Sequence, residues 1–457
     1  MKVLMVVPEL APFYKYSRLG LGENLRSLLF HLPKSAVAIM PYYRDIEIPT
    51  CRQVDTLPEL GLEVCETLFP ASQRRVLMIR PASDGAFDPF IAGKASLEQV
   101  ALFSRGVAAW VQRNPGWDVA HCHHWQTGLI PLLLRNLDHP VPSLFTFYDL
   151  EPQMSLFADD FCDLGLNPAL QSRVEKLTPL NLLALGVRFG KLLSTTSRRY
   201  AQDIRTENLG HGLDRLLVSR ESRLFGIMNG VRYDHWNPAG DAFLPVRYND
   251  ATGKLHAKSA LQNELELPCA PGVPLLFFGG RLTRSYGCDL LLEALPDLAD
   301  MPLQLVIYGT GDDEFMLKLE DLCEKWPNVR IRLGFDEAFL HRLVAGADMH
   351  LLPSREQPGG TNHLISLRYG AIPIARRTGG YVDAIHDQTE RGKHRVNGFL
   401  FGSFYVNSLL QTVQEALDVY AERDLWCEYI ESAMSADWSW KETAKAYKNL
   451  YRKLLPS

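Results

Sequence analysis

The chain contains 457 residues with a formal net charge of −5, and 46% of its residues are hydrophobic and 22% charged. This length exceeds what one hydrophobic core usually holds, so we expect two or three domains. The composition is typical of a folded chain and excludes a largely disordered one, while the acidic balance argues against a nucleic-acid partner. No uncharged apolar run approaches the roughly 18 residues of a membrane span, so we expect none.

Short apolar runs alternate with longer amphipathic stretches along the first half of the chain. The predicted strands are residues 3–7, 37–40, 75–79, 119–123, 143–147 and 192–197. Predicted helices occupy residues 21–32 and 96–112. Alternating β and α segments are typical of a parallel sheet with helices on both faces.

The second half repeats this pattern after a polar segment rich in Asn, Pro and Gly. Its predicted strands are residues 274–280, 303–309, 329–334, 349–354 and 371–375, with helices at 290–298, 313–326, 337–347 and 362–370. The fold class is therefore α/β, with two doubly wound, Rossmann-like domains. We assign them to residues 1–228 and 242–438, joined by a hinge at 229–241, and we expect a C-terminal helix (439–457) that packs back towards the first domain.

The eight cysteines are spread over the whole chain and form no C-x-x-C pair. This usage favours reduced thiols and a cytoplasmic location. The run His121-Cys122-His123-His124 contains metal-binding residue types. Adjacent residues of a strand point to opposite faces, however, so they seldom converge on one ion. We therefore predict no metal site.

Ligands of open α/β sheets bind beyond the carboxyl ends of the strands, so the loops that follow the predicted strands are the candidate site. These loops are residues 8–20, 122–128, 148–153, 279–287, 309–313, 353–360 and 376–380. Their polar and glycine-rich composition predicts a ligand cleft between the two domains.

Several segments, in order along the chain, carry a more specific signal. They include VVPELAPFYK (6–15), HCHHWQTGL (121–129), TSRRYAQDI (196–204), RLTRSYG (281–287) and LRYGAIPIARRTGGYVDAI (367–385). These segments resemble the bacterial glycogen synthase and starch synthase family, retaining glucosyltransferases of the GT-B fold. The resemblance implies transfer of glucose from a nucleotide sugar to an α-1,4-glucan, without a metal or other cofactor. It also implies that the first domain holds the acceptor and the second the donor.

The resemblance carries over residue by residue. It implies acceptor-side positions at His123, Trp125, Tyr148 and Asp149, and donor-binding positions at Lys15, Arg18, Arg281, Gly309, Gly311, Gly360, Thr361, Thr378 and Gly379. The glycines can equally be turn residues that the fold requires, and Trp125 can equally be a core residue. Arg281 fits either an anion site or a structural salt bridge.

Three positions differ from the residues that the family motifs carry. Tyr286 stands where the family has a Lys, Gln357 where it has a Glu, and Tyr148 where it has a His. Glu356 lies one place before Gln357, and it is a candidate substitute for the carboxylate. Neutral side chains do not stabilise developing charge as ions do, and losing one such group typically lowers a rate by about 10²–10³. No catalytic residue is therefore assigned as retained.

We place first a protein of this family without efficient glucan synthase activity. It would bind α-glucan or a nucleotide sugar, or pair with a true glucan synthase. The alternative is an active retaining hexosyltransferase that uses ADP-glucose, UDP-glucose or an altered donor, and a plain glycogen synthase that tolerates the changes comes third. Asp149 and Glu151 are either new acids or solvated loop charges, of which solvation is the more common fate.

Overall fold

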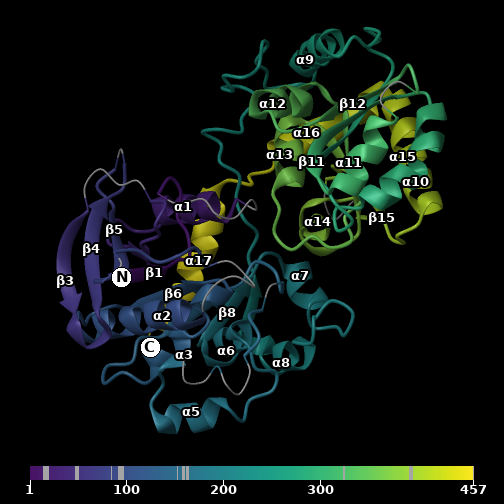
Figure 1. The fold of residues 1–457 in the computed structure, drawn as a ribbon. Coiled ribbons are helices and arrows are strands. Elements are labelled where there is room, and N and C mark those ends of the chain that lie inside the picture. The colour runs from purple at the N-terminus through teal and green to yellow at the C-terminus, as the bar shows by residue number, and fades with distance from the viewer. Residues whose placement is uncertain are drawn as a thin grey trace. The chain divides into compact units, whose positions relative to one another are not determined.

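The computed structural model describes residues 1–13, 20–46, 51–70, 72–83, 85–90, 97–151, 153–156, 160, 164–322, 325–390 and 395–455 (Figure 1). The chain divides into two compact units. Unit 1 contains Met1–Asn229 and Trp440–Ser457, and unit 2 contains Gly230–Ser439. Among the described helices, none is both long enough and apolar enough to cross a membrane.

Unit 1 is built on a sheet whose described strands follow the order β3-β4-β5-β2-β1-β6-β7-β8-β9. Strand β4 is antiparallel to β3 and β5, and the remaining neighbours are parallel. The strand bounds are β1 (Val3–Val6), β2 (Val37–Pro41), β3 (Arg52–Leu57), β4 (Leu62–Leu68), β5 (Arg75–Pro81), β6 (Val119–His123), β7 (Ser143–Thr146), β8 (Leu192–Thr195) and β9 (Leu224–Gly226).

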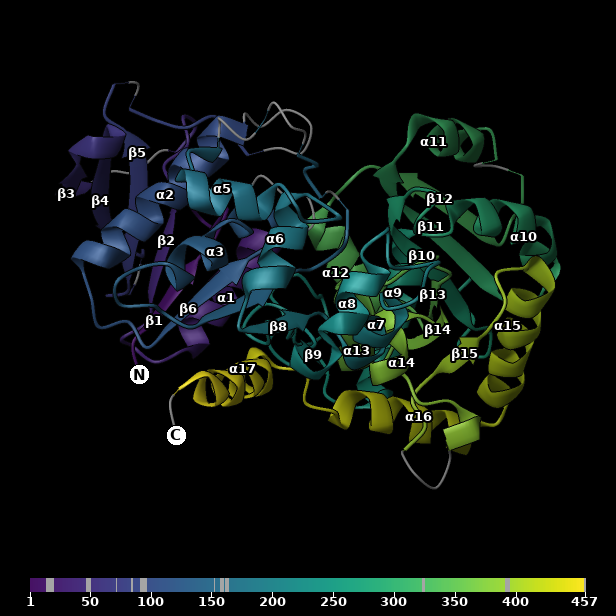
Figure 2. The same cartoon turned by 90° about the horizontal axis from the view of Figure 1, so that it is seen from below.

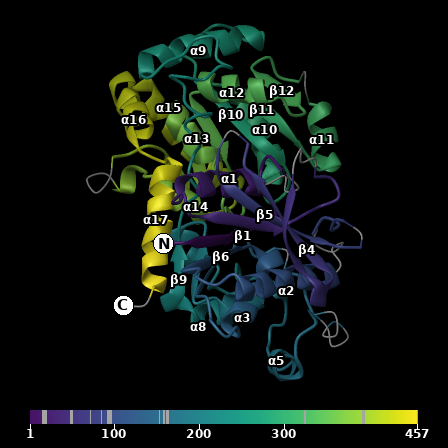
Figure 3. The same ribbon diagram turned by 90° about the vertical axis from the view of Figure 1, so that its left-hand side faces the viewer.

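Helices cover both faces of this sheet, as Figure 1 shows. The helices of unit 1 are α1 (Leu21–His31), α2 (Leu97–Arg113), α3 (Ile130–Arg135), α5 (Pro168–Val174), α6 (Leu182–Phe189), α7 (Arg198–Asp203), α8 (Asp214–Ser219) and α17 (Trp440–Leu454). Helix α3 packs against α2 and α6, while α17 packs against α1 and β7. The C-terminal helix therefore belongs to the core of unit 1, beside α1 (Figure 3).

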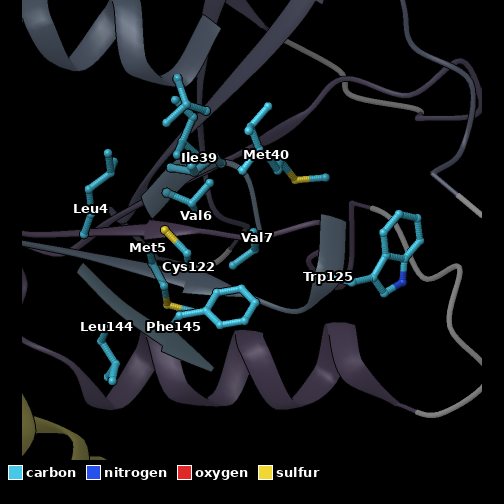
Figure 4. Close-up of a cluster of buried hydrophobic side chains, with 14 of the residues drawn as sticks. Leu4, Met5, Val6, Val7, Ile39, Met40, Cys122, Trp125, Leu144 and Phe145 are labelled. Carbon is cyan, nitrogen blue, oxygen red and sulfur yellow. The ribbon is translucent and has the colours of Figure 1, made fainter. Parts of the chain in front are cut away.

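The centre of unit 1 is an apolar layer between these helices and the central strands. Every residue of β1 is fully buried, as expected of a central parallel strand covered on both faces. Figure 4 shows the layer with Met5, Ile39, Cys122 and Phe145 among its labelled side chains. Phe145 reaches α6 because residue 186 is glycine: a Cβ there would lie 2.3 Å from the Phe145 ring. Helix α6 therefore packs closely against β7.

Unit 2 contains an all-parallel sheet with the order β12-β11-β10-β13-β14-β15 in its described residues (Figure 2). Its strands are β10 (Leu275–Leu282), β11 (Gln304–Gly311), β12 (Val329–Leu333), β13 (Met349–Leu352), β14 (Ile372–Arg376) and β15 (Phe399–Phe401). Its helices are α9 (Ala251–Glu264), α10 (Cys288–Asp300), α11 (Asp313–Glu320), α12 (Glu337–Gly346), α13 (Asn362–Tyr369), α14 (Gly379–Ala384), α15 (Val406–Ala421) and α16 (Arg423–Ser435).

The predicted α/β class with two doubly wound sheets is thereby confirmed. Strand order reverses direction at β1 in unit 1 and at β10 in unit 2. In doubly wound sheets, ligands bind beyond the carboxyl ends of the strands at such a switch point. The loops after β6, β7, β10, β11 and β13 are therefore the regions to inspect.

Candidate functional site

In unit 1 the site is organised by two neighbouring parallel strands. His123 of β6 lies opposite Thr146 of β7, so the two strands end together. His121 and His123 share one face of β6, with ring centroids 3.8 Å apart. The His121 ring is fully buried and its nitrogens are bonded to Tyr451 Oη at 2.7 Å and Thr146 Oγ1 at 2.6 Å. His121 therefore ties α17 to the sheet, and His123 is the histidine nearest the strand end.

His123 contacts one of the predicted acceptor-side residues. Its Nδ1 lies 3.0 Å from the hydroxyl oxygen of Tyr148, and the two rings are stacked at 6.2 Å. Burial, helped by the neighbouring His124, lowers the pKa of His123 to about 3. The ring is therefore neutral at pH 7. Its Nε2 is buried without a hydrogen-bond partner among the described residues, which leaves one polar atom available to a ligand hydroxyl.

Asp149 lies beside His124 just beyond the strand ends. Their closest atoms, Asp149 Oδ1 and His124 Nε2, are 3.8 Å apart. Burial and the Glu151 charge raise the pKa of Asp149 to about 7, against the lowering effect of a backbone hydrogen bond from Glu151. Burial lowers the pKa of His124 to about 4. At neutral pH this is an uncharged imidazole next to a carboxyl group that readily gains or loses its proton.

The expectation that these loop carboxylates are solvated is wrong for Asp149. Its side chain is only 20% exposed, and its Oδ1 is buried without a hydrogen bond among the described groups. The expectation fits Glu151, which is 78% exposed and lies 3.3 Å from His211. Sequence reasoning could not separate the two because exposure depends on how the loop folds over the strand ends.

Trp125 is the predicted acceptor-side residue that lies deepest. It is 1% exposed and belongs to the apolar core of unit 1, where Figure 4 labels it. Its burial favours the packing role that the sequence left open, since a platform for a sugar must present its ring to solvent.

In unit 2 the corresponding region begins where β10 and β11 end side by side. Gly309 and Gly311 face the backbone of β10 so closely that a Cβ would lie 1.9 Å from Gly280 O and 2.2 Å from Leu282 O. Gly309 also has a φ of +149°, which side-chain-bearing residues rarely adopt. These two glycines are thus required by the strand pairing itself.

Arg281 is the half-buried cation at this strand end. Among the residues that the structure describes, its guanidinium has neither an ion pair nor a side-chain hydrogen bond. The neighbouring Arg284 behaves differently, since it is 66% exposed and lies 3.8 Å from Asp289. A half-buried guanidinium without a counterion is poised for an anionic ligand. This favours the anion-site interpretation of Arg281 over the structural salt bridge.

Tyr286 lies in the loop that follows Arg281. Burial raises the pKa of Tyr286 although the nearby Arg281 charge lowers it, so the phenol is neutral at pH 7. The loop is held against the end of β13: a Cβ on Gly287 would lie 2.2 Å from Pro353 O, and Arg355 N donates to Ser285 O at 2.8 Å. This close approach places the Tyr286 loop beside the Gln357 loop.

Gln357 is 5% exposed and its amide donates to Gly360 O at 3.3 Å. The backbone carbonyl oxygen of Gln357 accepts a hydrogen bond from Gly380 N at 3.2 Å. The same oxygen lies so close to Gly379 that a Cβ there would be 2.0 Å from it. Gln357 therefore joins the loop after β13 to the start of α14. Thr361 precedes α13 and Thr378 precedes α14, and neither side chain caps its helix.

Three further predicted positions are Glu356, Lys15 and Arg18. Glu356 is half-buried beside Gln357. Lys15 and Arg18 lie outside the described residues. The structure adds Tyr381, a buried residue whose hydroxyl is 3.1 Å from Ser354 Oγ and whose ring packs edge-on to His363 with centroids 5.0 Å apart. Sequence reasoning missed this pair because a buried His and Tyr on short helices carry no pattern distinct from core residues.

Two doubly wound α/β units, each with polar groups beyond its strand ends, are the architecture of the GT-B fold. Residues 2–219 match the family model "Starch synthase catalytic domain", and residues 266–432 match "Glycosyl transferases group 1". The chain belongs to the glycogen synthase and starch synthase family, as the resemblance predicted.

Individual relatives support this assignment over the full length. A glycogen synthase of Geotalea daltonii is 32% identical, with 100% of this chain and 99% of the relative covered. Glycogen synthase 1 of Methylococcus capsulatus is 35% identical, with 100% and 97% covered. The catalytic domain of Starch Synthase IV from Arabidopsis thaliana, solved with ADP and acarbose bound, superposes with a TM-score of 0.82 at 27% identity and 99% coverage of both chains.

Proposed function

We propose that this chain is a retaining hexosyltransferase that moves a sugar unit from a nucleotide-sugar donor, ADP-glucose or UDP-glucose, onto an α-glucan. The observation that carries the proposal is the half-buried Arg281 guanidinium, which has no counterion among the described residues at the carboxyl end of β10. A leaving nucleoside diphosphate needs a positive group to neutralise its charge, and Arg281 supplies one. The relatives named glycogen synthase and the ADP-bound starch synthase support the same reaction class.

The unit 1 residues would contribute hydrogen bonds rather than charge. His123 is neutral and has one unpartnered nitrogen, and the Tyr148 hydroxyl lies against its other nitrogen. Such a pair suits sugar hydroxyls, which both donate and accept hydrogen bonds. Asp149 adds a carboxyl group whose pKa of about 7 fits proton exchange near neutral pH. The nucleotide sugar is a substrate in this scheme, and no further cofactor is required by it.

A second candidate is the binding protein that the sequence placed first. Tyr286 is half-buried, Gln357 is buried and both are neutral, so the half-buried Arg281 has no partner cation at position 286. Such a chain would bind donor or glucan, or pair with an active glucan synthase, without efficient transfer. The full-length similarity to glycogen synthases favours the transferase.

The test is to titrate the purified chain with ADP, UDP and their glucose conjugates by calorimetry, and to assay transfer of labelled glucose to glycogen. We expect binding and transfer, with Arg281→Ala weakening donor binding about 10–100-fold through loss of a charge-assisted contact. Arg284→Ala, which removes an exposed arginine from the same loop, is the matched control and leaves binding within about twofold.

The outcomes separate the two candidates. Arg281-dependent binding together with transfer supports the transferase. Arg281-dependent binding without transfer to any glucan supports the binding protein. Absence of binding at millimolar ligand overturns both candidates for these donors, as does equal loss of binding in the two arginine variants.

A further inference from the structure

A second cluster of ligating side chains lies in unit 2, away from the loops described above. The atoms His235 Nε2 and Glu337 Oε1 are 3.0 Å apart, and with His341 they form a group whose ligand atoms all lie within 4.8 Å of one another. Among the described residues this is the one such group of three. Glu337 and His341 are four residues apart on α12, which places them on the same face of the helix.

The His341 ring is oriented by a buried carboxylate behind it. His341 Nδ1 lies 2.7 Å from Asp241 Oδ2, which also accepts a hydrogen bond from the Tyr369 hydroxyl at 2.6 Å. Because this contact occupies Nδ1, the ring nitrogen that remains available to a ligand is Nε2.

That Nε2 atom is buried and unsatisfied. The His341 side chain is fully buried, and its Nε2 has no hydrogen-bond partner among the described residues. Trp236 stacks on the ring at 3.7 Å with an interplanar angle of 6°, and Phe243 lies 4.7 Å away. Stacking covers a face of the imidazole and leaves its in-plane lone pair free. A buried polar atom without a partner is unusual enough to require an explanation.

We propose that His235, Glu337 and His341 bind a divalent transition-metal ion, for which zinc is the best match. Two imidazoles and one carboxylate are a ligand set that zinc uses with an open fourth position. The Asp241 carboxylate on Nδ1 of His341 is the outer-shell partner that metal-ligating histidines usually have. The ion would join the segment around His235 to the first turn of α12.

The distances are compatible with this ion after small side-chain movements. Ligand atoms at about 2.0–2.1 Å from a tetrahedral zinc lie about 3.3–3.4 Å from one another. The His235–Glu337 distance of 3.0 Å is close to that value, while the widest separation of up to 4.8 Å must shrink. His235 and Glu337 are 29% and 53% exposed, so they can move towards the fixed His341.

The metal-free interpretation is a partly exposed contact between His235 Nε2 and Glu337 Oε1. Contacts of this kind at the surface contribute little to stability. This interpretation leaves the unpaired Nε2 of His341 without an explanation. The sequence predicted no metal site, and the one run of ligating residue types that it considered, residues 121–124, forms no comparable group among the described residues.

The experiment measures zinc affinity of the full chain after treatment with EDTA and desalting, by competition with a chromophoric chelator. We expect one zinc ion per chain, with Glu337→Gln and His235→Asn each lowering the affinity at least tenfold. Both side chains are partly exposed, so these variants should fold. His256→Asn is the matched control, because His256 is an exposed histidine of α9 in the same unit.

Cobalt(II) substitution gives a second readout. A nitrogen-rich site of low coordination number should produce visible absorption bands in the wild type and the His256→Asn variant, and these bands should be lost in Glu337→Gln. The proposal is overturned if the wild type binds no zinc at micromolar concentration, or if the two ligand variants bind zinc as the wild type does. Neither result depends on transferase activity, so failure here leaves the proposed function untouched.

Discussion

The strand ends of the two units differ in where their polar chemistry comes from. In unit 1 it comes from ionisable side chains, His123, His124 and Asp149, whose pKa values are shifted by burial. In unit 2 it comes from backbone groups brought close together by Gly309 and Gly379, and from Arg281, which has no counterion among the described residues. We therefore expect the stability of unit 1 to depend on pH, and the stability of unit 2 to depend on the side-chain volume at its glycines.

This difference separates two kinds of substitution. In unit 2, adding a single methyl group forces backbone atoms apart, so a small volume change should affect folding. In unit 1, isosteric exchange of a carboxyl for an amide keeps the volume and removes only a titration.

The largest expected effect is that of Gly379→Ala. Gly379 has a φ of +46°, and a Cβ there would lie 2.0 Å from Gln357 O, so both strain and a backbone clash oppose the alanine. We expect the free energy of unfolding to fall by about 2–4 kcal/mol, measured by denaturant titration. Gly402→Ala is the control, because a Cβ at Gly402 meets nothing within 4 Å. Equal stability of the two variants would contradict the close-approach account of unit 2.

The next effect concerns charge in the loop after β10. Tyr286→Lys places a second cation near Arg281, and we expect it to tighten ADP binding about tenfold, since preorganised charge favours a diphosphate. Tyr286→Phe is the control: it keeps the ring, removes the hydroxyl and should leave affinity within about twofold. Calorimetric titration with ADP measures both. If the lysine variant binds no more tightly than wild type, position 286 does not face the diphosphate.

Much of the fold could be predicted because the central strands are apolar runs bounded by turn residues. The predicted strand at residues 119–123 coincides with β6. The predicted strand 274–280 already includes Gly279 and Gly280, and β10 (Leu275–Leu282) continues past its end through Arg281 and Leu282. The extension was missed because a glycine pair followed by a charged residue resembles a loop, whereas Arg281 and Leu282 stay paired with β11, where Gly311 lets the two backbones approach.

The antiparallel hairpin of β3 and β4 was missed for a different reason. Strand β3 reads RQVDTL and is mostly exposed at the edge of the sheet, so it carries little apolar signal. An edge strand with polar side chains also blocks pairing with other chains, which explains why its composition resembles a loop. The doubly wound prediction covers the parallel strands and not this hairpin.

For the candidate site, the sequence located the loops but not the state of their side chains. Neither the free guanidinium of Arg281 nor the burial of Asp149 follows from local pattern, because both depend on what packs over the strand ends. The group of His235, Glu337 and His341 is harder still, since its members are separated by about a hundred residues and only the pair on α12 shows a regular spacing.

The smallest expected effect is a pH dependence at Asp149. Its pKa of about 7 in the folded chain exceeds its ordinary value of 3.8, so the folded state holds a proton that the unfolded state releases between these values. Its contribution to stability is therefore present below about pH 4 and is lost as pH rises to about 7. Asp149→Asn removes this loss.

The variant should thus gain stability relative to wild type as pH rises from 4 to 8, by about 1 kcal/mol. A three-unit shift would correspond to about 4 kcal/mol at most, and the 20% exposure of the side chain reduces that value. Asp45→Asn, which alters an exposed carboxylate of unit 1, is the control and should show no such trend. Denaturant titrations at several pH values measure both. A stability difference for Asp149→Asn that stays constant with pH would mean that the carboxyl group titrates alike in the folded and unfolded chain. The pH dependence expected of the unit 1 strand ends would then be wrong for Asp149.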